Sequence, residues 1–425
     1  MSTGTLALLL FGLFAVLLVF KVPVSFCLGI ASMVCLVILD YPLTVIAQKV
    51  FGALNSFSIM AIPLFILAGN LMTEGGLSKR LVGFCETLLG NVRGGLALVA
   101  IFACAFFAAL SGSGPATVIA IGGMIYPEMV KRGYPDYQVA GLVTVAGGLG
   151  PIIPPSIIMV VYCTMTNTSI TSLFSAGFVV GALLVITLVT LAMVQARIHH
   201  WPKTGVKFSV SRLLAAFKDS ALALIMPVVV LGGIYSGLFT PTEAGAMAVF
   251  YSLIVCMLIY KTVNIRSLFK IVKDSAISCS VIMFIMGTST TFSWLFTVSG
   301  ISKYLVSMVQ NSGLGYYPIL LMITVILLIF GFFLEGTATV TLLIPLFLPI
   351  AVSVGIDPLH LGMIVSLTNV IGCMTPPVAN NIFACSTYTG LSLGRISKGE
   401  IPYLMGFLFV LVLVVFIPQM VTMFG

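Results

Sequence analysis

Two polar, glycine-containing stretches interrupt long apolar segments of this sequence: SGSGPATV at residues 111–118 and EGTATV at residues 335–340. Their glycines, Gly114 and Gly336, are 222 positions apart. The same separation relates four further pairs without a gap: Pro127 and Pro349, Gly133 and Gly355, Gly150 and Gly372, and Pro154-Pro155 and Pro376-Pro377. Because several pairs share one separation, we predict that the chain contains an internal repeat.

Apolar segments close to the roughly 20 residues that cross a bilayer recur along the whole chain. Of the 425 residues, 60% are hydrophobic and only 7% are charged, which excludes a soluble globular protein. We expect ten spans, at residues 5–20, 22–39, 57–73, 138–165, 173–195, 220–238, 244–260, 276–298, 359–386 and 401–423. The stretches 94–130 and 318–353 contain the polar interruptions, so each is predicted to be a re-entrant hairpin.

The predicted fold class is an all-α polytopic membrane protein built from two inverted-topology repeats. Residues 1–200 form the first repeat, residues 201–219 an amphipathic cytoplasmic linker, and residues 220–425 the second repeat. Each repeat has an odd number of spans, five, so the second is inserted upside down. Each contains scaffold helices (1–90 and 220–298), its hairpin, a discontinuous helix (138–165 and 359–386) and a last helix (173–195 and 401–423). Apolar residues at helical spacing in 43–50 and 265–272 predict an amphipathic arm in each repeat.

The net charge of +8 reflects how the basic residues are distributed across the membrane. With both termini outside, 17 of the 19 basic residues lie on the cytoplasmic side, and only Lys49 and Lys303 lie outside. This asymmetry follows the positive-inside rule. We therefore expect a multi-pass membrane protein whose two termini lie on the side opposite the cytoplasm, surrounded by membrane lipid and without a nucleic-acid partner.

Glycine and proline interrupt the discontinuous helices too, in GGLGPIIPP at 147–155 and NVIGCMTPP at 369–377. Carbonyl groups released there from helical pairing are tolerated at membrane depth only when they are buried in protein or line a cavity. Carbonyl and hydroxyl oxygens suit Na⁺, whereas transition metals prefer ligand types that these stretches lack. We predict two symmetry-related sodium sites and at least two Na⁺ per cycle. The candidate ligands are Ser111, Ser113, Gly114, Thr117, Gly148, Gly150, Gly336, Thr337, Thr339, Gly372, Thr375 and Pro376.

The one acid inside an apolar run is Glu335. A carboxylate at membrane depth is a functional candidate because its burial is costly. Three roles stay open for it: contact with substrate, tuning of the neighbouring cation site, or a protonated structural group. No Lys or Arg accompanies it, so an anionic substrate would be held by helix N-termini, sodium and polar side chains. The candidate substrate-binding residues are Ser111, Ser156, Glu335 and Asn380.

Other classes of function are disfavoured by the sequence. The sequence has no P-loop lysine, so we do not expect ATP to drive transport. It also has no metalloprotease-type histidine motif, so it does not indicate an enzyme. A channel would need a pore-lining ring of charge, and paired hairpins suit alternating access better.

Four stretches resemble one known family: FFAALSGSGPAT at 106–117, IPPSI at 153–157, GIDPLH at 355–360 and TPPV at 375–378. They resemble the large membrane (M, DctM-type) subunit of tripartite ATP-independent periplasmic (TRAP) transporters, and the likeness covers essentially the whole chain. The longer stretches at 111–135 and 147–164 look most like the sialic-acid branch of that family.

The resemblance implies sodium-coupled symport of a small organic anion, sialic acid first, by an elevator movement of the hairpins and discontinuous helices against a scaffold. It implies a place in the bacterial inner membrane, with both termini in the periplasm. It also implies two partners: a small four-helix membrane (Q, DctQ-type) subunit and a periplasmic substrate-binding protein. It places the sodium sites at the hairpin tips and the facing breaks, with substrate between them around Ser111, Ser156 and Glu335. The alternatives are a C4-dicarboxylate or other sugar-acid TRAP permease, and a sodium/anion elevator carrier that needs no binding protein.

Overall fold

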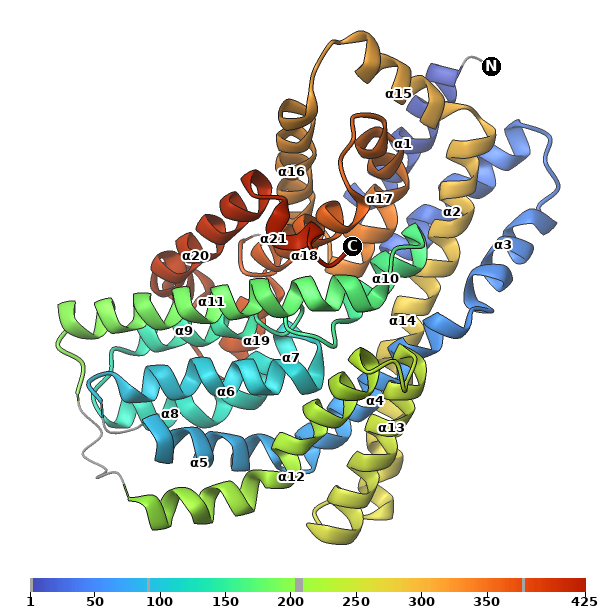
Figure 1. Ribbon diagram of the computed structural model, residues 1–425. Helices are drawn as coiled ribbons and strands as arrows, with labels where there is room; N and C mark the ends of the chain where they lie inside the picture. The colour runs from blue at the N-terminus through green and yellow to red at the C-terminus, as the bar shows by residue number, and fades with distance from the viewer. Residues whose placement is uncertain (1–2, 90–91, 203–208, 377–378) are drawn as a thin grey trace.

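The structure is a computed structural model that describes residues 3–89, 92–202, 209–376 and 379–425 (Figure 1). Within these residues all regular structure is helical. Seven helices are long and apolar enough to cross a membrane, and shorter apolar helices of 10–17 residues lie among them. An all-helical, multi-pass membrane protein is therefore confirmed. Five of the ten predicted spans are among these seven helices, and the other two helices, Tyr316–Phe333 and Gly336–Ser353, lie in the second predicted hairpin. The predicted spans at 5–20, 22–39, 138–165 and 359–386 correspond to helices of 17 residues or fewer.

Each half of the chain opens with a series of helices. The first half contains α1 (Thr3–Val19), α2 (Val24–Ile38), α3 (Thr44–Leu54), η1 (Phe57–Met60), α4 (Ala61–Glu74) and α5 (Leu77–Leu89). The second contains α12 (Val210–Tyr235), α13 (Pro241–Leu253), the π-helix η3 (Ile254–Ile259), α14 (Ile265–Val298) and α15 (Ile301–Asn311). Helices α5 and α15 lie between predicted elements. In α5 a buried stripe of Leu77, Leu81 and Cys85 repeats every fourth residue, as in an amphipathic helix.

Two predicted boundaries differ from the structure. The arm expected at 265–272 and the span expected at 276–298 form one helix of 34 residues, α14 (yellow in Figure 1). Residues 265–298 contain no proline, so nothing stops the helix between the two. Helix α12 likewise starts at Val210, inside the predicted linker, and runs on into the predicted span. In the first half, α3 does end before the next span, at Asn55.

Both polar interruptions lie where two helices of a hairpin meet. In the first hairpin, α6 (Gly95–Ser111) meets the run of α7 (Gly114–Thr117), η2 (Val118–Gly122) and α8 (Gly123–Lys131). In the second, α16 (Tyr316–Phe333) meets α17 (Gly336–Ser353). Gly112 ends α6 with φ +59°, a left-handed conformation that glycine adopts without steric cost.

The predicted discontinuous helices are interrupted as expected. Helices α9 (Asp136–Gly147) and α10 (Ile157–Thr166) form the first, and α18 (Pro358–Cys373) and α19 (Asn380–Thr389) the second. The last helix of the first half is α11 (Ile170–Ile198); the second half ends with α20 (Leu393–Phe416) and α21 (Gln419–Thr422). Pro377 and Val378 of the second break, and Lys203 and Lys207 of the linker, lie outside the described residues.

The two halves meet at the hairpin tips. Helix α7 packs against α9 of its own half and against α19 of the other half, and Figure 1 shows α19 (red) beside α7 and α9 (cyan). Helix α17 packs in the same way against α18 of its own half and against α10 of the other. Each tip is therefore enclosed by pieces of both discontinuous helices, which brings the interruptions together.

Candidate functional site

Three oxygen-bearing residues converge at the tip of the first hairpin. The Thr117 hydroxyl donates to the Ser113 carbonyl over 2.7 Å and lies 3.0 Å from the Ser111 hydroxyl. Ser111 and Thr117 are buried, and Ser113 is half-buried. These residues lie close together because the left-handed Gly112 reverses the chain between α6 and α7. The tip thus presents hydroxyl and carbonyl oxygens in an otherwise apolar interior, which suits a hard cation.

The backbone of the first break touches this tip directly. A Cβ atom on Gly150 would lie 2.6 Å from the Ser113 carbonyl oxygen, and one on Gly112 would lie 2.5 Å from the Pro155 carbonyl oxygen. Both distances are shorter than a carbon–oxygen contact tolerates, so glycine is required for this approach. Gly148 faces elsewhere: a Cβ there would collide with the side chains of Met374 and Val370. Of the two predicted glycines, only Gly150 contacts the tip.

Asn381, from α19 of the other half, adds a further oxygen. Its amide nitrogen donates to the Thr144 carbonyl over 3.2 Å, which orients the side chain. The Oδ1 atom is buried and has no hydrogen-bond partner within the described part of the chain. A Cβ atom on Gly114 would lie only 2.7 Å from it, so Oδ1 faces the hairpin tip. An unpaired buried acceptor is costly, and a cation at the tip would satisfy it.

The second hairpin tip has different chemistry. The Thr337 hydroxyl donates to the Glu335 carboxylate over 2.5 Å, and the Thr339 hydroxyl donates to the Glu335 carbonyl over 3.2 Å. The Asn369 amide donates to the Gly336 carbonyl over 2.8 Å, linking the tip to α18. Thr337, Thr339 and Asn369 are buried, while Glu335 is exposed at the tip. A carboxylate stands here at the position that Ser113 occupies in the first hairpin.

The remaining candidates of the second half lie apart from this hydrogen-bonded group. Gly372 packs against the backbone of Gly331, on α16 before the tip. The Thr375 hydroxyl donates to the Ile371 carbonyl over 2.8 Å, as a helical back-bond, and Pro376 is exposed. Gly372 lies near the end of α18, and Thr375 and Pro376 follow that helix in the second break.

Two candidate substrate residues lie at the starts of helices. The Ser156 hydroxyl donates to the Pro151 carbonyl over 2.6 Å and accepts from the Met159 amide over 3.3 Å, so it caps α10. With an exposed fraction of 1%, Ser156 holds the break in shape. Asn380 is half-buried at the first residue of α19. A substrate contact stays a prediction for both.

Sequence reasoning overlooked two buried polar residues. Asn381 is the residue after the predicted Asn380. The face of α19 that packs against α7 carries Asn381, so this residue and not Asn380 reaches the first hairpin. Glu400 is 1% exposed on α20, and its Oε2 has no hydrogen-bond partner among the residues that the structure describes. The last predicted span begins at residue 401, so Glu400 was placed just outside it. The backbone of Gly399 and Glu400 packs against Gly141 of α9, which buries the carboxyl.

The orientation of the helices adds a fixed electrostatic field. Helices α10 and α19 begin at the breaks, and the returning helices of both hairpins begin at Gly114 and Gly336. Four helix N-termini, which carry partial positive charge, therefore lie around the tips. The region can hold cations on carbonyl and hydroxyl oxygens and an anion near amide groups, without a basic side chain.

Comparison with known proteins decides the family. The family model "Tripartite ATP-independent periplasmic transporter, DctM component" matches residues 11–420. The chain belongs to this family. It is 41% identical over 373 residues to the C4-dicarboxylate TRAP transporter large permease protein DctM of Pseudomonas aeruginosa, covering 88% of this chain and 87% of that protein. It is 37% identical to the protein of the same name from Rhodobacter capsulatus, covering 97% of each. It is a transporter permease and not an enzyme.

The fold of this TRAP permease is also found in a solved transporter. The crystal structure of the Alcanivorax borkumensis YdaH transporter matches it with a TM-score of 0.63, covering 88% of this chain and 87% of that one, at 16% sequence identity. At that identity the match concerns the fold alone.

The sialic-acid branch predicted from the sequence is not confirmed. The sialic acid TRAP transporter large permease protein SiaM of Vibrio cholerae is 31% identical over 398 residues, covering 93% of each chain. Both DctM proteins named above are more similar to this permease.

Proposed function

We propose that this permease imports a small dicarboxylate together with sodium, as the large subunit of a TRAP transporter of the bacterial inner membrane. The observation that carries the sodium part is the first hairpin tip. There, the hydroxyls of Ser111 and Thr117, the Ser113 carbonyl and the unpaired Oδ1 of Asn381 converge in a buried space. A cation is the simplest partner for so many acceptors, and oxygen ligands of this kind suit Na⁺.

The second tip is the proposed partner site, and Glu335 sets it apart. Its carboxylate accepts from Thr337, so the negative charge is held beside the buried hydroxyls of the tip. We assign it to tuning of the second sodium site, with Thr337 and the Gly336 carbonyl as neighbours. A carboxylate attracts a cation and repels an anionic substrate until sodium is bound. Sodium must then bind before the dicarboxylate, and this order couples the two fluxes.

The proposed substrate is a C4-dicarboxylate, which was expected from the sequence as the alternative to sialic acid. This assignment rests on the two relatives with 41% and 37% identity, which are both named as C4-dicarboxylate permeases. The chemistry of the site is compatible with it, because helix N-termini and bound sodium can hold carboxylates without Lys or Arg. Sialic acid stays as the alternative substrate, with the more distant relative in its favour.

The proposed movement is of the elevator type, with periplasmic termini and two inverted repeats. The hairpins and discontinuous helices interlock across the halves, as α7 with α19 and α17 with α10, so they are suited to move as one body. The tripartite family implies a small membrane subunit and a periplasmic binding protein that delivers the substrate. Each inward Na⁺ charge would contribute about 2.3 kcal/mol per 100 mV of membrane potential.

The test is uptake of radiolabelled succinate into proteoliposomes that contain the permease and its small membrane subunit. The binding protein and an inward sodium gradient are added separately and together, and unlabelled sialic acid is the competitor in a parallel series. Succinate uptake that needs both additions and is unaffected by sialic acid supports the proposal. Succinate uptake that unlabelled sialic acid abolishes would make sialic acid the better substrate. Uptake without sodium would remove the coupling, and uptake without the binding protein would indicate an ordinary carrier.

A further inference from the structure

A cavity of about 300 Å³ lies between the scaffold and the helices that are proposed to move. Its walls come from α3, η1 and α14 of the scaffold, and from α10 and α17 of the proposed moving body. Five of its lining side chains carry hydroxyl groups: Ser56, Thr164, Ser289, Thr290 and Ser293. The cavity is therefore large enough and polar enough to hold a small organic anion.

The cavity is separate from the hairpin tips and the breaks. Thr164 lies eight residues beyond Ser156 on α10, and Ile344 lies eight residues beyond Gly336 on α17. With a rise of about 1.5 Å per residue, each lies roughly 12 Å along its helix from the proposed sodium sites. In the proposed orientation the arm α3 is on the periplasmic side. The cavity therefore lies on the periplasmic approach to the tips.

The hydroxyl groups of the cavity differ in what they can still bind. Those of Ser289 and Thr290 each donate to the Met286 carbonyl over 2.9 Å, so they can only accept from a ligand. The hydroxyls of Ser56 and Ser293 make no hydrogen bond to any residue that the structure describes, although both residues are half-buried. These two hydroxyls are therefore free to donate to a carboxylate.

Lys49 places a positive charge beside the cavity. It precedes Gly52 and Ala53 by three and four residues on α3, so it shares the helix face that lines the cavity. Its amino group lies 5.3 Å from the centre of the Trp294 ring, and Trp294 directly follows Ser293 on α14. Lys49 forms no ion pair with an acid in the described part of the chain. An aromatic ring holds a cation without neutralising it, so this charge is available to an anion.

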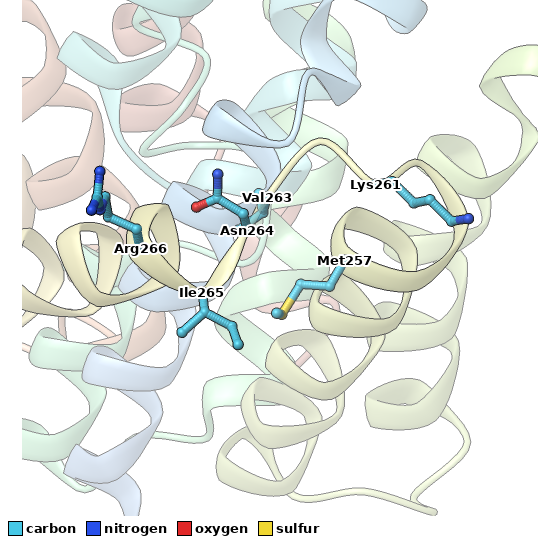
Figure 2. Close-up of a pocket in the computed structure, with 6 residues that line it drawn as sticks. All are labelled: Met257, Lys261, Val263, Asn264, Ile265 and Arg266. Carbon is cyan, nitrogen blue, oxygen red and sulfur yellow. The ribbon is translucent and has the colours of Figure 1, made fainter.

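A larger hollow between η3 and α14 lacks such convergence. It has a volume of about 690 Å³, and Lys261 and Arg266 are among its lining residues. Figure 2 shows the charged ends of these two side chains extending away from each other, so they do not meet at one ligand. The smaller cavity, where a cation and two free hydroxyls lie at one place, is the better anion site.

We propose that the cavity beside Lys49 is an entry subsite, which holds a carboxylate of the substrate before the substrate reaches the hairpin tips. Lys49 attracts the anion, and the hydroxyls of Ser56 and Ser293 donate to the carboxylate. The walls belong to both the scaffold and the moving body, so the elevator movement would open the cavity toward the tips. The inference rests on the proposed function for the class of substrate and for the orientation, but not on sodium.

The test places a thiol in the cavity with Ser293→Cys. Its matched control is Thr297→Cys, one turn further along α14, exposed and not part of the lining. The permease and its small subunit are purified in nanodiscs, and the rates of modification by an anionic and a cationic methanethiosulfonate reagent are measured, with the unmodified protein as the background. Labelling is repeated with succinate, its neutral diamide succinamide, or sialic acid. Thermal unfolding verifies that each variant is folded, and Ser56→Cys is the second cavity position.

We expect the anionic reagent to be favoured at position 293 more than at position 297. Adding K49Q should lower the ratio of anionic to cationic rates at position 293 by about fivefold, as for the loss of one nearby unit charge in an aqueous cavity. Adding K303Q, which removes the other lysine expected outside, should leave this ratio unchanged. Millimolar succinate, but not succinamide, should slow labelling at position 293 and not at position 297.

A reagent ratio at position 293 that K49Q does not change would overturn the inference, as would equal protection of the two positions. Succinate uptake in vesicles together with no protection of position 293 would overturn it too, while leaving the proposed function in place. Protection of position 293 by sialic acid instead of succinate would support the entry subsite and would correct the proposed substrate.

Discussion

Gly150→Ala tests whether the contact between the first break and the first hairpin tip forms the sodium site. The added Cβ atom would lie 2.6 Å from the Ser113 carbonyl oxygen and 2.7 Å from the Ser113 carbonyl carbon. Both are backbone atoms, so the hairpin tip must move by several tenths of an ångström. Gly150 has no left-handed φ, so the alanine causes no strain of its own in the chain. The cost arises at the contact.

Overpacking of this kind costs about 1–3 kcal/mol. If the displaced Ser113 carbonyl is a sodium ligand, the sodium concentration for half-maximal uptake should rise by roughly 5- to 150-fold. Sodium should also raise the melting temperature of the purified variant less than that of the unmodified permease. Weaker sodium binding stabilises the folded state less. The thermal measurement needs neither the binding protein nor the substrate.

Gly123→Ala is the matched control. Gly123 lies on the returning arm of the same hairpin, and nothing lies within 4 Å of a Cβ atom placed there. In a helix this change is neutral or stabilises by up to about 1 kcal/mol. It should leave sodium activation unchanged. A half-maximal sodium concentration for Gly150→Ala within twofold of that for Gly123→Ala would refute the placement of sodium at this contact.

Three other substitutions have expected outcomes. Thr117→Ala removes a hydroxyl of the first tip and should raise the half-maximal sodium concentration by several fold with insertion intact; unchanged sodium activation would remove this hydroxyl from the ligands. Ser156→Ala removes the cap of α10 and should lower the unfolding free energy by about 1 kcal/mol, while a specific loss of substrate affinity in equilibrium binding would instead assign Ser156 to the substrate. Glu335→Gln keeps an acceptor for Thr337 but removes the charge, so sodium-driven uptake should fall at least tenfold by the loss of about 1.4 kcal/mol or more of cation binding; normal uptake would make Glu335 structural.

The architecture of the site was predictable because it is encoded by local signals. Glycine and proline mark where helices stop, and the separation of 222 residues shared by five pairs predicted that the two interruptions correspond. One boundary was predicted where the sequence has no residue that ends a helix. Residues 265–298 contain no proline, so α14 continues from the predicted arm into the predicted span. The sequence also predicted neither α5 nor α15, whose apolar stripes are short.

Individual side chains were less predictable, because their positions depend on contacts between the two halves. Asn381 reaches the first hairpin only because α19 packs against α7, more than two hundred residues earlier in the chain. Gly148 and Gly372 share the composition of the breaks, yet they pack against Met374 and Gly331 instead of the tips. Glu400 is buried because Gly141 and Gly399 let α9 and α20 approach closely. These relations between distant residues leave no pattern in a single sequence.

The most direct test of the central claim is to measure both fluxes in the same vesicles. Proteoliposomes with the permease, its small subunit and the binding protein are loaded without sodium, and the entry of ²²Na⁺ and of ¹⁴C-succinate is followed together, for the unmodified protein and for Gly150→Ala. The account predicts a fixed ratio of at least two sodium ions per succinate and a loss of both fluxes in the variant at low sodium. Succinate uptake with no accompanying sodium flux would contradict it.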